Sequence, residues 1–324
     1  MSSNPMSKFI HCFLPLILCS VFCWNGFGEQ PELFVTVLGV AQDAGYPQSG
    51  CKKECCKLAW EDFNERKFVS CVALVDRTSN QFFMFDCTPD FRDQFALLQQ
   101  IANLKSKTVV DGIFLTHAHI GHYTGLMQLG HEVMGTSNVP VYGTERMANF
   151  LTNNGPWSQL VSFKNIKLNE LVADTPIQIN PRIKITPFKV PHRDEFSDTV
   201  GFKIESKSKS LVYLPDIDKW SKWNRSVESV VEKCDFALLD GSFFADGEIP
   251  GRDMASIQHP FIQESIKRFS SLEKDVRKRI KFIHLNHTNP AIRLNGDPAK
   301  NSAARQIYEA GMGLAKQGEI ISLD

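Results

Sequence analysis

The 324-residue chain has no excess of charge of either sign, because 36 Lys and Arg residues balance 36 Asp and Glu residues. It also lacks a basic run interleaved with aromatic residues, a pattern typical of nucleic-acid-binding proteins. Charge therefore gives no reason to expect nucleic acid or an anionic membrane surface as a partner. Repeats of solenoid length and long low-complexity linkers are absent as well. With 43% hydrophobic residues, the chain is able to bury a large core.

A hydrophobic run long enough for an ordinary membrane-spanning helix is also missing, since the apolar run over residues 9–22 is short for a span. Lys8 precedes this run and the small residues of Gly26-Phe27-Gly28 follow it, an order typical of a secretory signal peptide. We predict a signal peptide over residues 1–28 and one domain over residues 29–324. The protein would be exported to the periplasm or cell envelope, without stable membrane association after signal removal. An uncleaved anchor is the alternative.

The nine cysteines fall into three groups of three. Of the nine cysteines, three fall within the leader and three lie singly in apolar, strand-like runs, where they are expected to be small buried residues. The other three, Cys51, Cys55 and Cys56, form a tight cluster. Export would permit disulfide bonds, but such clusters more often hold a metal ion. One disulfide with one free thiol is the alternative for this cluster.

Histidine, in contrast, is concentrated in one short segment. His117, His119 and His122 fall within six residues, directly after the apolar run 109–115. That run predicts a buried strand that delivers the three side chains into a loop. Neutral imidazole is a ligand for zinc, iron and manganese. The segment therefore predicts a divalent metal site.

Hydrophobic periodicity and turn residues predict a mixture of strands and helices. Strands are expected at 33–40, 69–76, 81–86, 110–116, 139–142, 160–163, 183–188, 200–206, 210–214, 236–239, 280–285 and 319–322. Helices are expected at 91–104, 124–134, 226–233, 260–269 and 299–317. Hairpins early in each half and helices between later strands indicate an α/β protein with two mixed sheets and helices outside them.

Polar residues that suit a metal site stand where several predicted strands end. Asp86, His192 and Asp216 each close or follow such a strand, and His284 and His287 follow another. Side chains at strand ends on one edge of a sheet converge on a common site.

This ordered series of a strand-end aspartate, a histidine cluster, and a later His, Asp and His resembles the metallo-β-lactamase superfamily over nearly all of residues 33–324. The resemblance implies an αββα sandwich with one or two metal ions at the sheet edge. Carried over by position, it implies that His117, His119 and His192 bind the first ion. It further implies that Asp216 binds one metal ion or bridges two, that His122 binds the second ion, and that Asp86 supports the histidine loop.

One position departs from the superfamily motif HxHxDH, because Gly121 stands where the motif has aspartate. In the superfamily that aspartate binds the second metal ion and helps orient the attacking water. Glycine removes this hard anionic ligand. The departure therefore implies a single metal ion, or one strong and one weak site.

A closer resemblance, to the pyrroloquinoline quinone (PQQ) synthesis protein B family of the same superfamily, rests on segments 38–51, 240–244 and 282–290. The phosphonate-pathway cyclic phosphodiesterase is a more distant relative. These proteins carry a structural zinc held by an N-terminal cysteine cluster and a C-terminal histidine. The resemblance implies such a Zn²⁺ site here, although the spacing CxxxCC departs from the family's CxCxxC. The residues implied as its ligands are Cys51, Cys55, Cys56 and His287.

Two histidine assignments stay open at this point. His284 and His287 are three residues apart, so each is able to complete either metal site. The strand-end pattern favours His284 for the active centre and His287 for the cysteines. His259 lies where the PQQ synthesis protein B family has a histidine, and it either lines the pocket or caps a helix.

A divalent metal ion with an open coordination position lowers the pKa of water to near neutrality. We therefore predict a metal-dependent hydrolase of a small molecule with an ester, lactone, amide or phosphodiester bond. The predicted catalytic residues are Asp216, His122 and His259. Zn²⁺ is expected at the active centre, with Mn²⁺ or Fe²⁺ as alternatives. The loop with Asp43, Tyr46 and Gln48, together with residues 243–259, is expected to form the substrate walls.

Two other functions compete with hydrolysis. The closer resemblance implies quinone cofactor synthesis, in which an iron-dependent oxidative step is one alternative. A non-catalytic metal-binding or ligand-binding homologue is the other. Metal content and turnover of model substrates separate these functions.

Overall fold

The computed structural model describes residue 1 and residues 31–103, 106–293 and 301–324. The predicted signal peptide therefore lies outside the described residues. Contacts divide the chain into Met1–Gln30 and Pro31–Asp324, and every element described below lies in the second unit. Within the described residues, no helix is both long and apolar enough to span a membrane.

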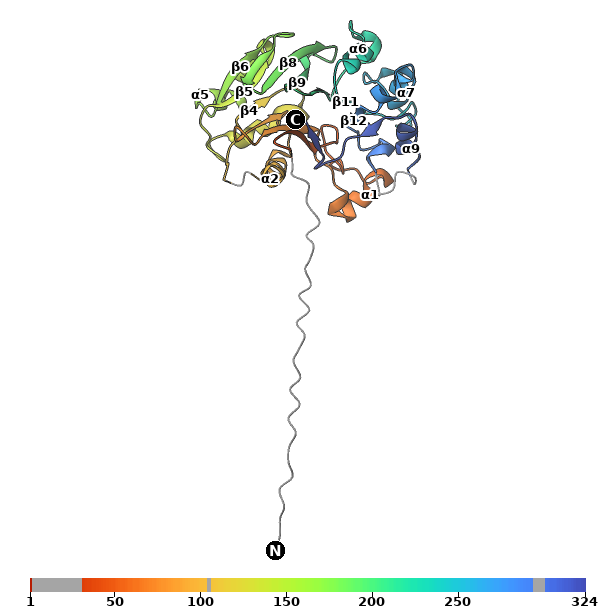
Figure 1. Ribbon diagram of the computed structural model, residues 1–324, viewed down its shortest axis with the longest axis horizontal. Coiled ribbons are helices and arrows are strands. Elements are labelled where there is room, and N and C mark those ends of the chain that lie inside the picture. The colour runs from red at the N-terminus through yellow and green to blue at the C-terminus, as the bar shows by residue number, and fades with distance from the viewer. Residues whose placement is uncertain (2–30, 104–105, 294–300) are drawn as a thin grey trace. The chain divides into compact units, whose positions relative to one another are not determined.

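Two sheets, each of seven described strands, form the centre of the unit (Figure 1). The first has the order β14-β1-β2-β3-β4-β5-β6, and the second β13-β12-β11-β10-β9-β8-β7. The strands of the first sheet are β1 Leu33–Gly39, β2 Cys71–Asp76, β3 Gln81–Phe85, β4 Gly112–Phe114, β5 Val139–Thr144, β6 Ile166–Leu171 and β14 Ile320–Ser322. Those of the second are β7 Ile177–Asn180, β8 Ile183–Val190, β9 Thr199–Glu205, β10 Ser210–Leu214, β11 Phe236–Asp240, β12 Ile280–Ile283 and β13 Gly313–Leu314.

Both sheets are mixed, and each changes from antiparallel to parallel pairing at one strand. In the first sheet β3 pairs antiparallel with β2 and parallel with β4. In the second, β10 pairs antiparallel with β9 and parallel with β11. The carboxyl ends of β3, β4, β8, β10 and β12 carry predicted site residues. Ligand sites in α/β proteins form outside such strand ends.

Helices cover the outer face of each sheet. The described α-helices are α1 Glu54–Glu61, α2 Phe91–Ala102, α3 Ile120–Tyr123, α4 Glu145–Asn153, α5 Trp157–Ser162, α6 Val227–Glu232, α7 Ile262–Phe269, α8 Lys274–Arg277 and α9 Ser302–Glu309. The described 3₁₀ helices are Phe63–Glu65, Thr124–Leu129, Trp220–Lys222, Met254–Ser256 and Pro290–Ile292. Buried residues of α2, α4 and α5 share one core with the first sheet, and those of α6, α7 and α9 share another with the second. Figure 1 shows α7 and α9 beside β11 and β12.

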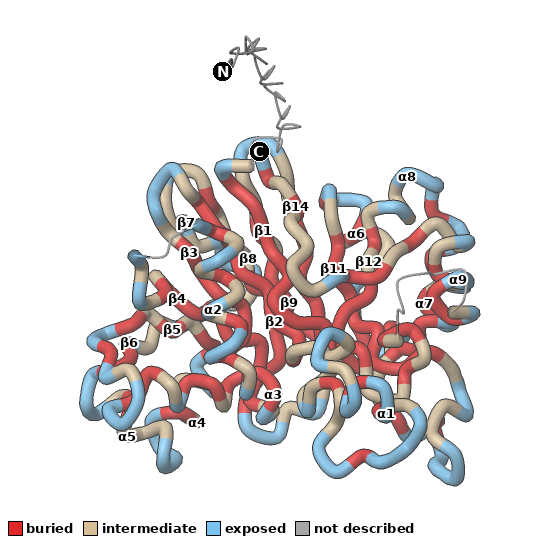
Figure 2. Tube along the Cα trace, turned by 90° about the horizontal axis from the view of Figure 1, so that it is seen from below, coloured by how far each residue is buried: buried red, intermediate tan, exposed pale blue. Residues whose placement is uncertain are grey.

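A third core lies between the two sheets, and aromatic rings dominate its centre. The ring of Phe85 stacks on Phe114 with centroids 5.1 Å apart. It also meets Phe202 of the second sheet edge to face at 5.4 Å. Such ring pairs add to the hydrophobic stabilisation of the packed sheets. Figure 2 shows β1, β2 and β9 as buried, with exposed residues gathered in outer loops and helices. These layers confirm the predicted α/β fold with two mixed sheets and helices outside.

Several predicted elements were wrong in type or length. Residues 160–162 of the predicted strand 160–163 belong to helix α5, whose Trp157 packs on Tyr123 with centroids 5.0 Å apart. A short apolar run does not distinguish a strand from a buried helix segment. The predicted helix 124–134 is the 3₁₀ helix Thr124–Leu129. The predicted helix 299–317 is α9 followed by β13, because Gly311 adopts a φ of 82° that ends the helix.

Candidate active centre

The histidine loop follows β4 and is fixed by a buried carboxylate from the neighbouring strand. Asp86, directly after β3, is fully buried and accepts hydrogen bonds from Thr116 N and Thr116 Oγ1, both at 2.8 Å. Its Oδ2 lies 2.8 Å from Nδ1 of His122. The residue adopts a φ of 68°, a conformation that surrounding contacts must hold in place. Asp86 thus has the position expected of a residue that supports the loop.

The structure brings His117, His119, His192 and Asp216 together into one group, here called the first donor group. Nε2 of His117 lies 2.9 Å from Nδ1 of His119, and Nε2 of His192 lies 3.2 Å from the same atom. Asp216 Oδ2 is 3.4 Å from His117 Nε2 and 3.3 Å from His192 Nε2. Ligand atoms about 2.0–2.1 Å from a tetrahedral zinc ion lie about 3.3 Å apart, so the four atoms fit such an ion.

Glu195 orients one ring of this group, and no pattern in the sequence indicated it. Its Oε2 lies 3.0 Å from His119 Nε2, which leaves Nδ1 of that ring to face His117 and His192. Carboxylates commonly orient a metal-ligating histidine in this way. Glu195 lies in the loop between β8 and β9, at least four residues from either strand.

A second donor group contains Asp43, His122 and His284. Nε2 of His122 is 3.2 Å from Asp43 Oδ1, and Nε2 of His284 is 3.9 Å from it. His284 follows β12 with a φ of 65°, and its Nδ1 lies 2.8 Å from Ser242 Oγ. Sequence reasoning placed Asp43 in a substrate wall instead. The signal that was missed is a carboxylate in the loop that follows β1.

Asp216 lies between the two groups. Besides its contacts in the first donor group, its Oδ2 is 3.8 Å from His122 Nε2 and 3.9 Å from His284 Nε2. Burial acts to raise the pKa of this carboxyl, but the surrounding histidines, His192 first among them, hold it well below its usual range. The carboxylate form is therefore available to both groups.

Several buried polar atoms of these groups have no hydrogen-bond partner, which is costly unless another ligand satisfies them. They include His122 Nε2, His284 Nε2, Asp43 Oδ1 and Asp216 Oδ1. The rings of His122 and His284 are fully buried. Burial, and then the charge of His122, holds the pKa of His117 well below its usual range. Unsatisfied imidazole nitrogens beside carboxylates are a donor set that fits a divalent cation.

His259 stands beside the two groups, held by a carboxylate that the sequence analysis did not single out. Its Nδ1 lies 2.8 Å from Asp240 Oδ2 and 3.3 Å from Asp216 Oδ1. Burial acts to lower the pKa of His259, but the charges of Asp240 and Asp216 raise it to about 9. Asp240 ends β11, so the same strand-end reasoning could have identified it. His259 does not cap a helix, because the neighbouring helix α7 begins at Ile262 and has Phe261 as its N-cap residue.

Comparisons with known proteins identify the family of the chain. Residues 82–285, more than half of the chain, match the model of the beta-lactamase superfamily domain. The chain belongs to the β-lactamase superfamily. It is 24% identical over 320 residues to coenzyme PQQ synthesis protein B of Methylorubrum extorquens (strain PA1), covering 90% of this chain and 100% of the relative.

Solved structures of superfamily members share the fold of this chain. Zn²⁺-bound PqqB from Methylobacterium extorquens has a TM-score of 0.72 and 21% identity, covering 90% of this chain and 100% of that one. A diphosphatase of the PhnP family has a TM-score of 0.61 and 21% identity, covering 89% and 96%. The resemblance to the metallo-β-lactamase superfamily and to PQQ synthesis protein B is thus confirmed, and the superfamily includes hydrolases.

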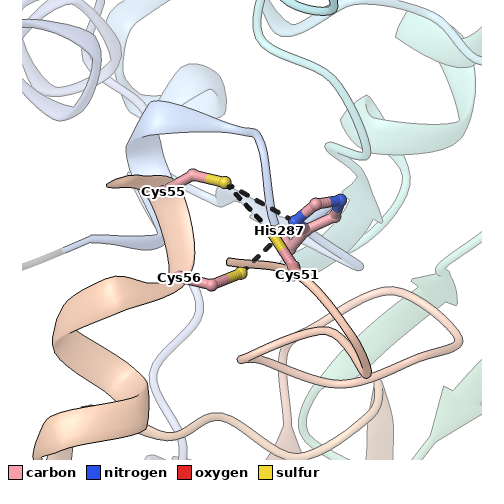
Figure 3. A group of neighbouring side chains, drawn as sticks. All are labelled: Cys51, Cys55, Cys56 and His287. Atoms are coloured by element: carbon pink, nitrogen blue, oxygen red, sulfur yellow. Dashed lines mark hydrogen bonds between the residues drawn. The ribbon is translucent and has the colours of Figure 1, made fainter. Parts of the chain in front are cut away.

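A separate donor group lies at the predicted structural zinc site, where Cys51, Cys55, Cys56 and His287 face one another (Figure 3). Sγ of Cys56 is 3.3 Å from His287 Nδ1, and Sγ of Cys55 is 3.7 Å from it. The sulfurs of Cys51 and Cys55 are 3.7 Å apart, too far for a disulfide bond of about 2.05 Å. All six cysteines in the described part of the chain are free. The structure therefore places His287 with the cysteines and His284 in the second donor group.

A cavity of about 270 Å³ opens beside His192 and His259, and it is here called the active-centre cavity. Its lining residues are Gln42, His192, Arg193, Phe243, Arg252, Ser256, Ile257, Gln258, His259 and Asn286. Residues 243–259 thus form part of its wall, as predicted. Tyr46 does not, because its buried hydroxyl donates a 2.7 Å hydrogen bond to Cys55 O beneath the cysteine group. Gln48 and Asp43 line a neighbouring hollow.

Proposed function

We propose that the protein is a metal-dependent hydrolase acting on a small molecule with an ester, lactone, amide or phosphodiester bond. The observation that carries the proposal is the position of Asp216 next to the active-centre cavity. This residue belongs to the first donor group, and its Oδ2 also lies 3.8 Å from His122 Nε2 and 3.9 Å from His284 Nε2 in the second. A divalent metal ion bound there would polarise a carbonyl or phosphoryl oxygen and lower the pKa of water. Zn²⁺ is the proposed ion, because histidine nitrogens and carboxylate oxygens are its usual ligands.

The residues of the chain have distinct roles in this proposal. His117, His119 and His192 would hold one ion with Asp216, and His122 and His284 would hold the other. His259 is held by Asp240 through Nδ1, and its ring lines the cavity. It is therefore placed to give a proton to the leaving group. Arg193 and Arg252 of the cavity wall would favour a substrate that carries negative charge.

The cysteine group has a structural role in the proposal. Three cysteines and one histidine form a closed set of four donors, which is typical of structural rather than catalytic zinc. We propose that Zn²⁺ bound there ties the segment before β2 to the segment after β12. We further propose that the mature protein is exported, as the leader predicts, and meets its substrate in the periplasm or cell envelope.

The test combines metal analysis with turnover. The protein is purified without added metal, its zinc, manganese and iron contents are measured, and hydrolysis of model p-nitrophenyl esters, lactones, anilides and bis(p-nitrophenyl) phosphate is followed. We expect hydrolysis of at least one class, and its loss by 100-fold or more in His117→Ala. Iron content with oxygen-dependent turnover would instead support the oxidative function. Metal at the cysteine group alone, with no turnover, would leave a non-catalytic homologue.

A further inference from the structure

Gly121 and Asp43 lie against each other, and this contact explains the departure from the superfamily motif. We propose that Asp43 replaces the aspartate that the motif HxHxDH has at the position of Gly121. Asp43 would then act, with His122 and His284, as the carboxylate ligand of a second divalent metal ion. The inference rests on the metal centre of the proposed function, and it assigns a ligand from a different loop.

The first argument is steric. A Cβ atom at Gly121 would lie 2.2 Å from Asp43 Oδ1 and 2.5 Å from Asp43 Cα. Both distances are far below van der Waals contact, and the second involves backbone. No side chain at position 121, aspartate included, is compatible with the present course of the loop that carries Asp43. The loop therefore occupies the space that the motif aspartate would fill, and it brings its own carboxylate there.

The second argument concerns the donor atoms. Asp43 Oδ1, His122 Nε2 and His284 Nε2 all lie within 4.8 Å of one another. All three are buried atoms without a hydrogen-bond partner. The other nitrogen of each ring is already engaged, since Nδ1 of His122 faces Asp86 and Nδ1 of His284 faces Ser242. The free nitrogens are thus oriented toward Asp43, as in metal sites where outer hydrogen bonds fix the ligand rings.

The third argument is that the Asp43 loop is held in place next to His284. Ala41 forms a parallel bridge with Leu285, the residue after His284. Gln42 N donates to Leu285 O at 2.9 Å, and Leu285 N donates to Val40 O at 2.8 Å. The side chain of Asn286 also donates to that of Gln42. Asp43 thus directly follows a short backbone extension of β1, and this extension pairs with the chain just after His284.

The test counts metal ions rather than turnover. Wild-type protein and Asp43→Asn are stripped with chelator, reloaded with Zn²⁺, desalted, and analysed by mass spectrometry for zinc per chain. The affinity of the most weakly binding site is measured by titrating the stripped protein with Co²⁺ and following the visible absorption bands of the bound ion. We expect about three equivalents in the wild type, one of them at the cysteine group, and about two in Asp43→Asn. Affinity for the lost ion should fall by at least 100-fold.

Three further variants make the result specific. Asp275→Asn removes an exposed carboxylate on helix α8 and should keep three equivalents. His284→Asn should lose the same ion as Asp43→Asn, so the double variant should lose no more than either alone. Asp43→Glu keeps a carboxylate and should retain the third ion with weaker affinity. It also provides the measurement if Asp43→Asn does not fold.

The outcomes distinguish this inference from the proposed function. Wild-type stoichiometry and Co²⁺ affinity in folded Asp43→Asn would overturn the inference, even if the protein hydrolyses a model substrate. Three equivalents in the wild type, with loss of one in Asp43→Asn and no turnover of any substrate, would support the inference and overturn the hydrolase.

Discussion

Asp86 and His122 form a buried pair, with Asp86 Oδ2 2.8 Å from His122 Nδ1 and both side chains fully buried. Burial acts to lower the pKa of His122, but the charge of Asp86, together with Asp43, raises it well above its usual range. His122 thus links Asp86, which supports the histidine loop, to the second donor group.

Asp86→Asn should weaken this connection without changing the backbone. Asparagine tolerates the positive φ at this position, so the change removes the charge and little else. Affinity for the second ion should fall about 10- to 100-fold, as for other residues that orient a metal ligand. Folding stability should fall by about 3–5 kcal/mol, because Nδ1 of the buried His122 loses its carboxylate partner, while the amide oxygen still accepts from Thr116. Co²⁺ titration and urea denaturation measure the two effects, and unchanged values in both would contradict the assigned role.

Gly121→Ala should displace the Asp43 loop. The added Cβ would meet Asp43 at 2.2 Å, and the backbone contact at 2.5 Å leaves no rotamer that relieves it. We expect a loss of stability of about 1–3 kcal/mol or more, together with loss of the second ion. Gly313→Ala is the matched control, since its nearest atom would be Lys281 Cγ at 3.4 Å, an ordinary contact. The unfolding temperature and the zinc content of the two variants test the steric argument. Equal values in both variants would contradict it.

Cys56→Ser should remove a different metal ion and lower stability. A closed set of three cysteines and one histidine contributes its binding free energy to folding. The variant should lose about one zinc equivalent and unfold at a lower temperature than the wild type. Cys234→Ala is the control, because Cys234 is buried away from the group and contacts Val231 O. It should lower the unfolding temperature slightly and keep full zinc content. Wild-type zinc content in Cys56→Ser would exclude the structural site.

His259→Gln should separate proton transfer from metal binding. We expect kcat to fall about 10²- to 10⁴-fold, the usual range for loss of a general acid or base. Zinc content should stay unchanged, because His259 Nδ1 faces Asp240 at 2.8 Å in a hydrogen bond. Steady-state kinetics and metal analysis are made on the same preparation. Loss of a zinc equivalent would show that His259 is a ligand instead.

The local pattern of the sequence predicted most strands and the residues that follow them. β1, β3 and β10 begin at the predicted residues and end within one residue of them, because their apolar runs are bounded by turn residues. The misassigned strand 160–163 is a short apolar run, and most of it belongs to helix α5, in which Trp157 packs on Tyr123. β6 and β7 were not predicted, since only a few of their residues are buried.

The sequence by itself determined that His117, His119 and His122 share one loop, and that Asp86 and Asp216 stand at strand ends. Those facts follow from spacing and from the carboxyl ends of buried strands. Only the tertiary structure decided which carboxylate reaches His122 and His284. Asp43 is 78 residues from Gly121 in the chain (121 minus 43), and nothing in the spacing of either motif reports that their atoms compete for one space. That competition arises because the loop after β1 pairs beyond the end of β12, a long-range contact that only the folded chain contains.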